Sequence, residues 1–270
     1  MPGARIVSLV PSLTELLCEL GLGPQLVGRT GFCIHPRSLL ESVPKVGGTK
    51  TVNIARIRAL APTHLVVNVD ENERATVEAL AEFIPYVVVT HPIELDDNLA
   101  LYSQFGEIFS VEHRARQLSD AFEQARLRAR TSAGSPVSVL YLIWRRPWMT
   151  VSQPTFISRM LAEVGLLTWP EGSQQRYPSL EAPDLARAPV AAVLLSTEPF
   201  RFDKVDREAL RRLFKRHNDP AHQAPAFLSV DGEMTSWYGS RAIMGLDYLT
   251  RLRARMDVRL HQAVAARRVS

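Results

Sequence analysis

The sequence lacks several features that mark disulfide-rich or membrane proteins. Only two of its 270 residues are cysteine, Cys18 and Cys33, so we expect no disulfide framework. No apolar run approaches the roughly 20 residues of a membrane-spanning helix, and the N-terminus lacks the charged and apolar segments of a signal peptide. As it stands, the sequence predicts a cytoplasmic protein without membrane insertion, and a periplasmic one if a signal segment was removed before Met1.

Short catalytic motifs are also missing from this sequence. It contains no Gly-x-Ser-x-Gly elbow, no His-Glu-x-x-His, no Gly-x-Gly-x-x-Gly after a strand and no Cys-x-x-Cys. Gly47 and Gly48 lie between two lysines but do not match a phosphate-binding loop. We therefore expect a binding protein rather than an enzyme, with no required cofactor.

What is present is an ordinary globular composition with a mild excess of positive charge. Hydrophobic residues make up 46% of the chain, the formal net charge is +4 and the sequence pI is about 9.3. Arginines gather in residues 114–130 and 251–268, and both stretches have a helical pattern, so solvated helix faces explain them. No nucleic-acid motif accompanies them, and we expect a monomer that binds no nucleic acid.

The first third of the chain alternates short apolar runs with helical patterns. Ser12 and Glu15 have the spacing of a capping box that begins a helix. Alternation of this kind predicts a parallel sheet covered by helices. The expected strands are residues 6–10, 26–28, 64–68 and 86–90, and the expected helices begin at 12, 53 and 73.

The middle of the chain has no convincing strand from about residue 95 to 131. Apolar residues recur there every three or four positions, which predicts one face of a long helix. Such a helix suits a rigid connector between two lobes, although a helix packed on one sheet gives the same pattern. The second half then resumes the alternation, with strands expected at residues 137–144, 191–196 and 226–230 and helices at 155–164, 204–215 and 240–262.

These patterns predict an α/β fold of two lobes with mostly parallel sheets. We expect an N-terminal α/β lobe over residues 1–94, a connecting helical segment over 95–134 and a C-terminal α/β lobe over 135–270. Open α/β sheets bind ligands beyond the carboxyl ends of their strands. Two lobes that face each other would form a cleft for the ligand.

Unusual side chains follow the strands of the second half. Trp144, Arg145 and Trp148 come at the end of one predicted strand, and Glu198 and Phe200 follow the next. Trp and Arg are favoured at binding hot spots, because Trp offers a flat apolar face and Arg a planar set of donors. Core packing is the alternative for Trp144, as a last strand residue.

The last predicted strand is followed by Trp237 and Tyr238 and then by Arg241 in the first turn of a helix. These aromatic rings and this guanidinium are further candidates for ligand contact. In the first half, Cys33 and His35 are two residues apart and could both ligate a soft metal. Two ligands are fewer than zinc sites use, and His35 could equally be a hydrogen-bonding partner of the ligand.

The ordered series of motifs resembles the class III, helical-backbone periplasmic binding proteins. The resemblance is carried by the opening run of residues 5–15, by Val46-Gly47-Gly48 and by residues 62–67. Ile143-Trp144-Arg145, residues 196–200 and residues 236–241 are similar to the vitamin B12 receptors of that family and to homologues without a signal peptide. The likeness extends over roughly residues 5–252.

The resemblance implies two α/β lobes joined by one long helix, with a corrinoid such as cobalamin, haem or a ferric chelate captured between them. It also implies an ABC permease as partner, which exported relatives dock through one glutamate on each lobe. Glu71 or Glu73 lies near that position in the first lobe. In the second lobe the matching position is Ser236, with Glu233 nearby.

Two other functions remain open at this point. An intracellular metal-binding enzyme or metal chaperone would use Cys33, His35 and Glu198 together. A regulatory interaction protein would fill its cleft with its own side chains.

Overall fold

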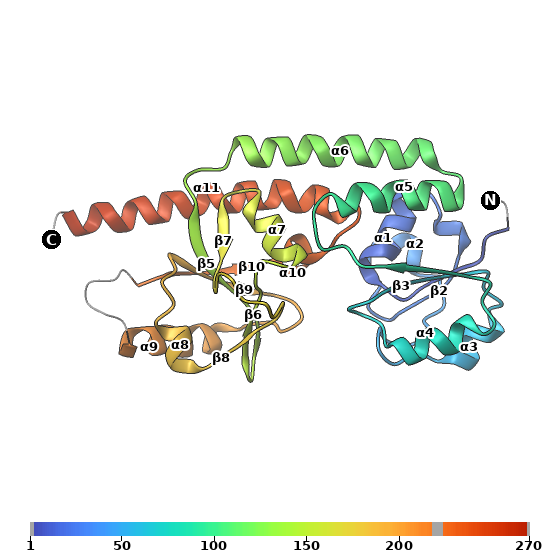
Figure 1. Cartoon of the computed structure of the whole chain (residues 1–270), viewed down its shortest axis with the longest axis horizontal. Coiled ribbons are helices and arrows are strands. Elements are labelled where there is room, and N and C mark those ends of the chain that lie inside the picture. The colour runs from blue at the N-terminus through green and yellow to red at the C-terminus, as the bar shows by residue number, and fades with distance from the viewer. Residues whose placement is uncertain (1–2, 218–223, 269–270) are drawn as a thin grey trace. The chain divides into compact units, whose positions relative to one another are not determined.

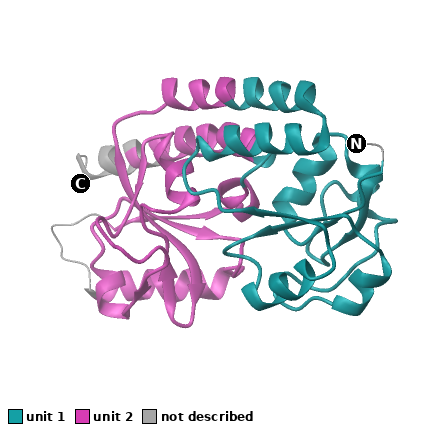
Figure 2. Cartoon of the chain, turned by 45° about the vertical axis from the view of Figure 1, so that its right-hand side comes forward, with its two compact units in different colours: residues 1–122, 238–241 teal, residues 123–237, 242–270 magenta. Residues whose placement is uncertain are grey.

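The computed structural model describes residues 3–217 and 224–268. The chain divides into two compact units (Figure 1 and Figure 2). Unit 1 comprises residues 1–122 and 238–241, and unit 2 comprises residues 123–237 and 242–270. The expected boundaries were 94/95 and 134/135. The first boundary instead falls inside helix α6 (Glu112–Thr131), and four residues before Ala242 return to unit 1.

Unit 1 contains a four-stranded sheet in which every neighbouring pair is parallel. Its order is β2-β1-β3-β4. Each strand contains valine or isoleucine, which favour extended backbone, and every residue of β1 and β3 is buried, as is usual for the central strands of a parallel sheet. The strands are β1 (Ile6–Ser8), β2 (Leu26–Arg29), β3 (His64–Asn68) and β4 (Tyr86–Thr90).

Helices cover both faces of the unit 1 sheet. In Figure 1, α3 and α4 lie on one face and α1 and α5 on the other. Ile57 of α3 and Leu80 of α4 pack with Val7, Leu65 and Val67 of the strands, which forms the core on their side. The helices are α1 (Pro11–Glu19), the 3-10 turn η1 (Gly23–Gln25), α2 (Arg37–Leu40), α3 (Ile54–Ala59), α4 (Arg74–Ala81) and α5 (Asp97–Phe109).

The predicted capping box at the start of α1 was wrong. The helix begins one residue earlier, at Pro11, with Val10 at the N-cap and no side-chain cap. Pro11 needs no amide partner and its fixed φ suits the first helical position, so it starts the helix without help from Ser12. Glu15 is instead held by an ion pair with Arg241.

The predicted helix over residues 95–131 is two helices, α5 and α6. Ser110 ends α5 in the left-handed conformation, with φ 57° and ψ 48°, and α6 begins at Glu112. Neither glycine nor proline marks this break, so the apolar periodicity gave no sign of it. The single connecting helix of the prediction is therefore α6 alone, which has 20 residues.

Unit 2 contains a six-stranded mixed sheet. Its order is β10-β9-β5-β6-β8, and β7 pairs with β5 beside the same edge as β6. Strands β10, β9, β5 and β7 are parallel, whereas β6 and β8 extend the sheet by antiparallel pairing. The strands are β5 (Val137–Arg145), β6 (Trp148–Thr150), β7 (Leu166–Thr168), β8 (Ser179–Leu180), β9 (Ala192–Ser196) and β10 (Ala226–Val230).

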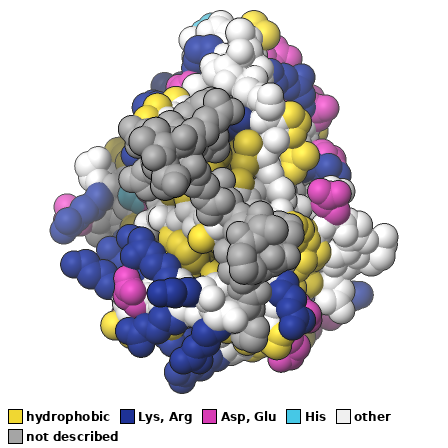
Figure 3. Space-filling model, turned by 90° about the vertical axis from the view of Figure 1, so that its left-hand side faces the viewer, with side chains coloured by type: hydrophobic (Ala, Val, Ile, Leu, Met, Phe, Trp, Pro, Cys, Tyr) yellow, Lys and Arg dark blue, Asp and Glu magenta, His cyan; other side chains and the backbone are white. Residues whose placement is uncertain are grey.

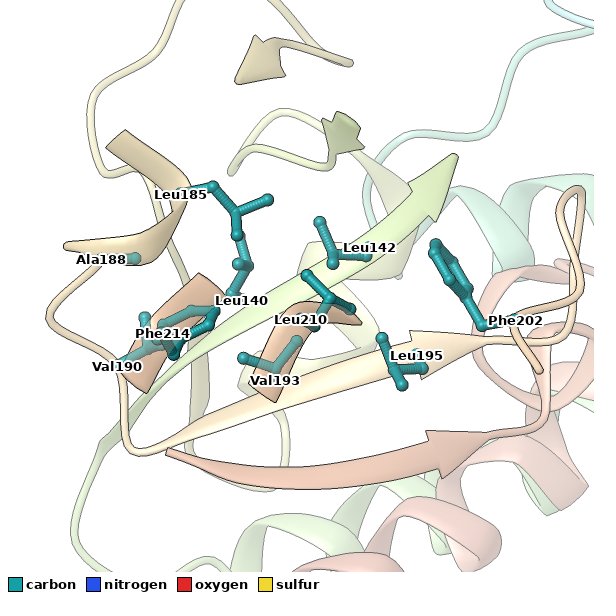
Figure 4. Packing of buried hydrophobic residues seen from close by; sticks show 10 residues of the cluster. All are labelled: Leu140, Leu142, Leu185, Ala188, Val190, Val193, Leu195, Phe202, Leu210 and Phe214. Atoms are coloured by element: carbon teal, nitrogen blue, oxygen red, sulfur yellow. The ribbon is translucent and has the colours of Figure 1, made fainter. Parts of the chain in front are cut away.

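One face of this sheet packs against α8 and α9, and Figure 4 shows the resulting core. Leu140 and Leu142 of β5 and Val193 of β9 meet Leu210 and Phe214 of α9. Figure 1 places α7, α10 and α11 on the opposite face. The helices are α7 (Phe156–Ala162), α8 (Ala182–Ala186), α9 (Lys204–His217), α10 (Gly232–Ser236) and α11 (Arg241–Arg268).

The short segment 238–241 is fixed within unit 1 by buried hydrogen bonds. Both the amide and the carbonyl of Gly239 are paired: its N–H donates to Asn98 Oδ1 at 2.7 Å, and its oxygen accepts from Tyr102 Oη at 2.9 Å. The Arg241 guanidinium donates to both carboxylate oxygens of Glu15, each at 2.7 Å. This segment is separated from its partners by more than 130 residues of sequence. Local hydrophobic periodicity could therefore not predict these contacts.

Candidate ligand-binding site

Aromatic side chains gather where β5 and β9 of unit 2 end. Trp144 and Phe200 lie edge to face, with ring centroids 5.6 Å apart, and Phe200 contacts Phe202 at 4.9 Å. Trp148 stacks parallel to Phe202 at 6.4 Å. We call these four residues the aromatic cluster. Trp144 is 40% exposed, and Trp148 and Phe200 are half-buried, so the cluster presents apolar ring surface to the exterior of unit 2.

The β5–β6 hairpin explains why two tryptophans of this cluster are close. We expected Trp148 to lie in a loop, but it begins β6, where Arg145 and Trp148 pair across the antiparallel ladder. Arg146 and Pro147 form the turn. The hairpin therefore holds Trp148 beside the end of β5, rather than on a mobile loop.

Arg145 is engaged by a buried carboxylate at this site. Its guanidinium forms an ion pair with Asp206, whose side chain is 4% exposed, and lies over the Trp148 ring at 5.9 Å. Asp203 and Asp206 exchange hydrogen bonds between backbone amides and carboxylates at 2.8 and 3.0 Å. The Asp206 amide is the largest of the causes that lower the pKa of Asp203. Arg145 thus ties the hairpin to the first turn of α9.

Glu198 and Trp237 meet at the ends of β9 and β10. The indole nitrogen of Trp237 donates to Glu198 Oε2 at 3.2 Å. Gly232 permits this arrangement, because a Cβ there would lie 2.8 Å from both the backbone nitrogen and the Cβ of Glu198. The Asp231 side chain accepts from Met234 N and caps α10. Glu198 and Trp237, which were both predicted as ligand contacts, therefore lie beyond the carboxyl ends of β9 and β10 and are partly exposed.

The loop after β2 in unit 1 alternates between buried and exposed side chains. Cys33 is fully buried, and its Sγ lies 3.0 Å from Thr14 Oγ1 and 3.1 Å from Thr30 Oγ1. Phe32 and Ile34 on either side are 63% and 51% exposed. Cys33 was predicted as a contact, and Phe32 and Ile34 were not. These residues lie in a turn in which the Cys33 amide donates to Thr30 O, so no strand alternation marked the exposed pair.

The environment of Cys33 does not suit a metal ligand. Burial raises the pKa of its thiol, which keeps the thiol protonated, whereas metals bind the thiolate. His35 is half-buried two residues further on. Over residues 3–217 and 224–268, no group of three or more His, Cys, Asp and Glu side chains is arranged to hold a metal ion. The metal-binding alternative has no support from this geometry.

Tyr238 and Arg241 lie in unit 1 and are 8% and 6% exposed. The Tyr238 hydroxyl donates to Glu71 Oε1 at 2.9 Å, and burial raises the pKa of this phenol well above its usual value. Arg241 is bound to Glu15. Because both polar groups are buried and committed to unit 1, we assign these residues to the structure of that unit and leave them out of the proposed ligand contacts.

The acidic residues considered for permease docking have different surroundings. Glu71 is half-buried and accepts the Tyr238 hydrogen bond. Glu73 is exposed, with Oε1 4.0 Å from Lys50 Nζ. Glu233 is half-buried in the first turn of α10 in unit 2. Nearby, His91 Nε2 lies 3.4 Å from Asp70 Oδ1 at the ends of β4 and β3.

Two α/β units with ligand-type residues beyond their parallel strands define a solute-binding protein of the two-lobed class. The chain belongs to the periplasmic binding protein family, whose model matches residues 6–217. Members of this family are binding proteins. None of the helices in the described ranges is both long and apolar enough to cross a bilayer.

Individual relatives narrow the comparison. The chain is 24% identical over 205 residues to a vitamin B12-binding protein of Pectobacterium carotovorum subsp. carotovorum (strain PC1), covering 74% of each chain. The crystal structure of the periplasmic vitamin B12 binding protein BtuF of Vibrio cholerae aligns with a TM-score of 0.77, 17% identity and coverage of 95% and 98%. The periplasmic heme-binding protein RhuT from Roseiflexus sp. RS-1 aligns with a TM-score of 0.79, 20% identity and coverage of 94% and 99%. These structures share the fold of this chain.

Proposed function

We propose that this protein captures a corrinoid of the cobalamin type, or a related metal chelate such as haem, as the binding component of an ABC uptake system. The observation that carries the proposal is the aromatic cluster of unit 2, with its exposed Trp144 ring beside the Glu198–Trp237 pair. Relatives named as vitamin B12-binding and heme-binding proteins support this ligand class.

The chemistry of this surface suits a broad ligand with apolar and amide groups. Trp and Phe rings bury a large area, and offset or edge contacts of their π systems add about 0.5–1.5 kcal/mol per pair. The Glu198 carboxylate accepts hydrogen bonds, for example from the amide groups at the rim of a corrin ring. Arg145 lies over the Trp148 ring, and its ion pair with Asp206 holds the guanidinium in that position.

Unit 1 has candidate ligand contacts of its own. Phe32 and Ile34 place exposed apolar surface after β2, and His35 offers an imidazole next to them. An imidazole can donate or accept a hydrogen bond or approach a chelated metal from one side. These residues replace Cys33, Tyr238 and Arg241 of the sequence prediction in the proposed set.

We also propose a permease partner and a periplasmic location, in keeping with the family. Glu73 is the exposed acid near the first-lobe docking position, and Glu233 is its candidate counterpart in unit 2. Replacing both with Gln should weaken association with the permease and leave the affinity for the ligand unchanged. Pull-down of the partner and ligand titration separate these two effects.

The ligand assignment is tested by titrating the purified protein with cobalamin and with haem, followed by absorbance and calorimetry. We expect saturable binding of at least one of them, and Trp144→Ala should weaken it roughly tenfold through loss of ring contact. Tyr86→Ala is the matched control, because Tyr86 is an exposed aromatic residue at the opposite, amino end of the unit 1 strands. Absence of binding at high micromolar ligand, or equal loss in the two variants, contradicts the proposal.

A further inference from the structure

Helix α9 of unit 2 has one buried face and one strongly cationic face. Asp206, Leu210 and Phe214 are spaced four residues apart and are buried, the two apolar ones in the core under the sheet. This fixes the rotation of the helix about its axis, so the opposite arc is exposed. The side chains exposed on that arc include Lys204, Arg211, Arg212, Lys215 and Arg216, which we call the cationic face.

Little negative charge balances the cationic face. Glu208 lies on the same arc and forms an ion pair with Arg211 at 2.9 Å. Asp206 points inward to Arg145, and Asp203 is tied to the first turn of the helix. Figure 3 shows Lys and Arg side chains gathered over the lower part of this end of unit 2, with few Asp or Glu side chains among them.

The other cations are free to meet an external partner. Within the described part of the chain, Lys204, Arg212, Lys215 and Arg216 have no ion-pair partner. From Lys204 to Arg216 the face extends over roughly 18 Å of helix, at 1.5 Å per residue. An unbalanced row of cations along a helix is complementary to an extended anionic surface. A pocket lies beside the row, where Arg211 and Lys215 line it together with Phe227, but Lys204, Arg212 and Arg216 lie outside it and extend the charge along the helix.

We propose that the cationic face of α9 adsorbs to bilayer surfaces that contain anionic phospholipids. Each Lys or Arg near such a surface contributes about 1 kcal/mol of attraction. The family description places its members in the periplasm, a compartment bounded by bilayers, and a bilayer with anionic lipids is an extended surface of negative charge. The face has one markedly exposed apolar neighbour, Val205, so adsorption is electrostatic and does not insert the helix. Confinement to the surface would shorten the search for a membrane-embedded partner.

The charge pattern also distinguishes a bilayer from a protein partner. Protein interfaces concentrate their binding energy in aromatic and arginine anchors that fill pockets. The aromatic residue of α9 is Phe214, which is 2% exposed and belongs to the core. Between Lys204 and Arg216 the face therefore offers arginine and lysine charge without an exposed aromatic side chain, which fits a diffuse layer of phosphate charges better than a shaped protein surface.

The test is co-sedimentation of the full chain with vesicles of neutral phosphatidylcholine alone or mixed with phosphatidylglycerol. We expect binding to the mixed vesicles only, and loss of binding in high salt because exposed charges are screened. The triple variant R212Q/K215Q/R216Q should reduce the partition coefficient roughly tenfold to a hundredfold, since three exposed cations are removed. Circular dichroism and ligand titration should be unchanged in this variant.

A matched control removes the same net charge elsewhere. Lys45, Arg56 and Arg116 are exposed on unit 1, so K45Q/R56Q/R116Q changes two arginines and one lysine away from α9. We expect this variant to bind the mixed vesicles nearly as well as the wild type. Equal loss in both triple variants would show a general charge effect and overturn the proposal.

Two further results would also overturn it. One is failure of the wild type to bind mixed vesicles above neutral ones at low salt. The other is binding of duplex DNA through α9 without binding to vesicles, which would assign the face to nucleic acid. None of these outcomes depends on the identity of the captured ligand, so the surface proposal and the ligand proposal fail independently.

Discussion

The buried ion pair between Glu15 and Arg241 is a contact that the sequence did not reveal at the residue scale. An arginine in the first turn of a helix, next to two aromatic residues, has the pattern of a ligand contact. Its partner is 226 residues away in sequence, and both side chains are almost fully buried, at 8% and 7% exposure. Arg145 is similar, because its partner Asp206 lies on a helix 61 residues later. Long-range pairing of this kind has no local signal.

Breaking the buried pair should be costly. Glu15→Gln leaves the Arg241 charge buried without a carboxylate, and we expect a loss of about 3–5 kcal/mol in the free energy of unfolding. Chemical denaturation measures this directly. The double variant Glu15→Leu/Arg241→Met should recover much of the loss, because it leaves no buried charge. A single variant as stable as the wild type would show that the pair is solvated.

The two cysteines predict a dependence of stability on alkaline pH. Burial is the largest cause that raises the pKa of Cys18 to about 12, and it also raises the pKa of Cys33. A thiol whose pKa is higher in the folded protein contributes stability below the unfolded pKa, and this contribution falls as the pH rises above about 8.5. The wild type should therefore lose more stability between pH 7 and pH 10 than Cys18→Ala does. Urea unfolding of both proteins at the two pH values gives the comparison, and equal losses would contradict it.

At the scale of elements, the strands were more predictable than the helices and the sheet edges. The bounds of β3, β4 and β10 agree with the predicted ranges, because each contains a short apolar run flanked by polar residues or proline. Strands β6, β7 and β8 were missed, since strands of two or three residues are too short to show alternation. Trp144 was correctly placed at the end of β5, but Trp148 lies in β6, and the hairpin that orients both rings was not foreseen.

The break between α5 and α6 is a local property that can be tested. Ser110 has φ 57°, a conformation that costs a residue with a Cβ roughly 1–2 kcal/mol and costs glycine almost nothing. Ser110→Gly should therefore raise the thermal midpoint by a few degrees. Glycine at the exposed helical position Glu107 should lower it, because there the added backbone freedom is lost on folding. A lower midpoint for Ser110→Gly would contradict the assignment.

The close approach at Gly232 makes α10 sensitive to one added methyl group. A Cβ at this position would lie 2.8 Å from Ser196 Oγ as well as from Glu198, so Gly232→Ala should displace α10 from the end of β9. We expect a loss of roughly 1–3 kcal/mol in stability, and weaker ligand binding because Trp237 shifts from Glu198. Gly23→Ala is the control, since its nearest neighbour would be 3.6 Å away. Thermal unfolding and ligand titration test both parts.

At the scale of the whole molecule, unit 1 is built from two separate segments of the chain. Residues 238–241 complete it, and both flanking segments belong to unit 2. The predicted division at residues 94/95 and 134/135 followed changes in secondary structure, whereas the units are defined by buried contacts. Hydrophobic periodicity is a local property of the sequence. It therefore cannot predict contacts between residues 238–241 and the first 122 residues.

This interleaving predicts a single cooperative unfolding transition. All four tryptophans lie in unit 2, so their fluorescence reports on that unit, whereas circular dichroism reports on both. Unfolding of unit 2 releases residues 238–241 and leaves Glu15 buried without its partner, which destabilises unit 1. The two probes should therefore give coincident denaturation curves. A fluorescence transition well separated from the circular dichroism transition would show that the units unfold independently.

The order of synthesis gives the segment 238–241 a further consequence. A growing chain exposes Phe122 long before it exposes Arg241, and at about 5–20 residues per second the interval is roughly ten seconds. During that time the sheet of unit 1 can assemble. The Glu15 carboxylate has no ion-pair partner until Arg241 has been translated. Unit 1 therefore remains incomplete until residues 238–241 have been translated.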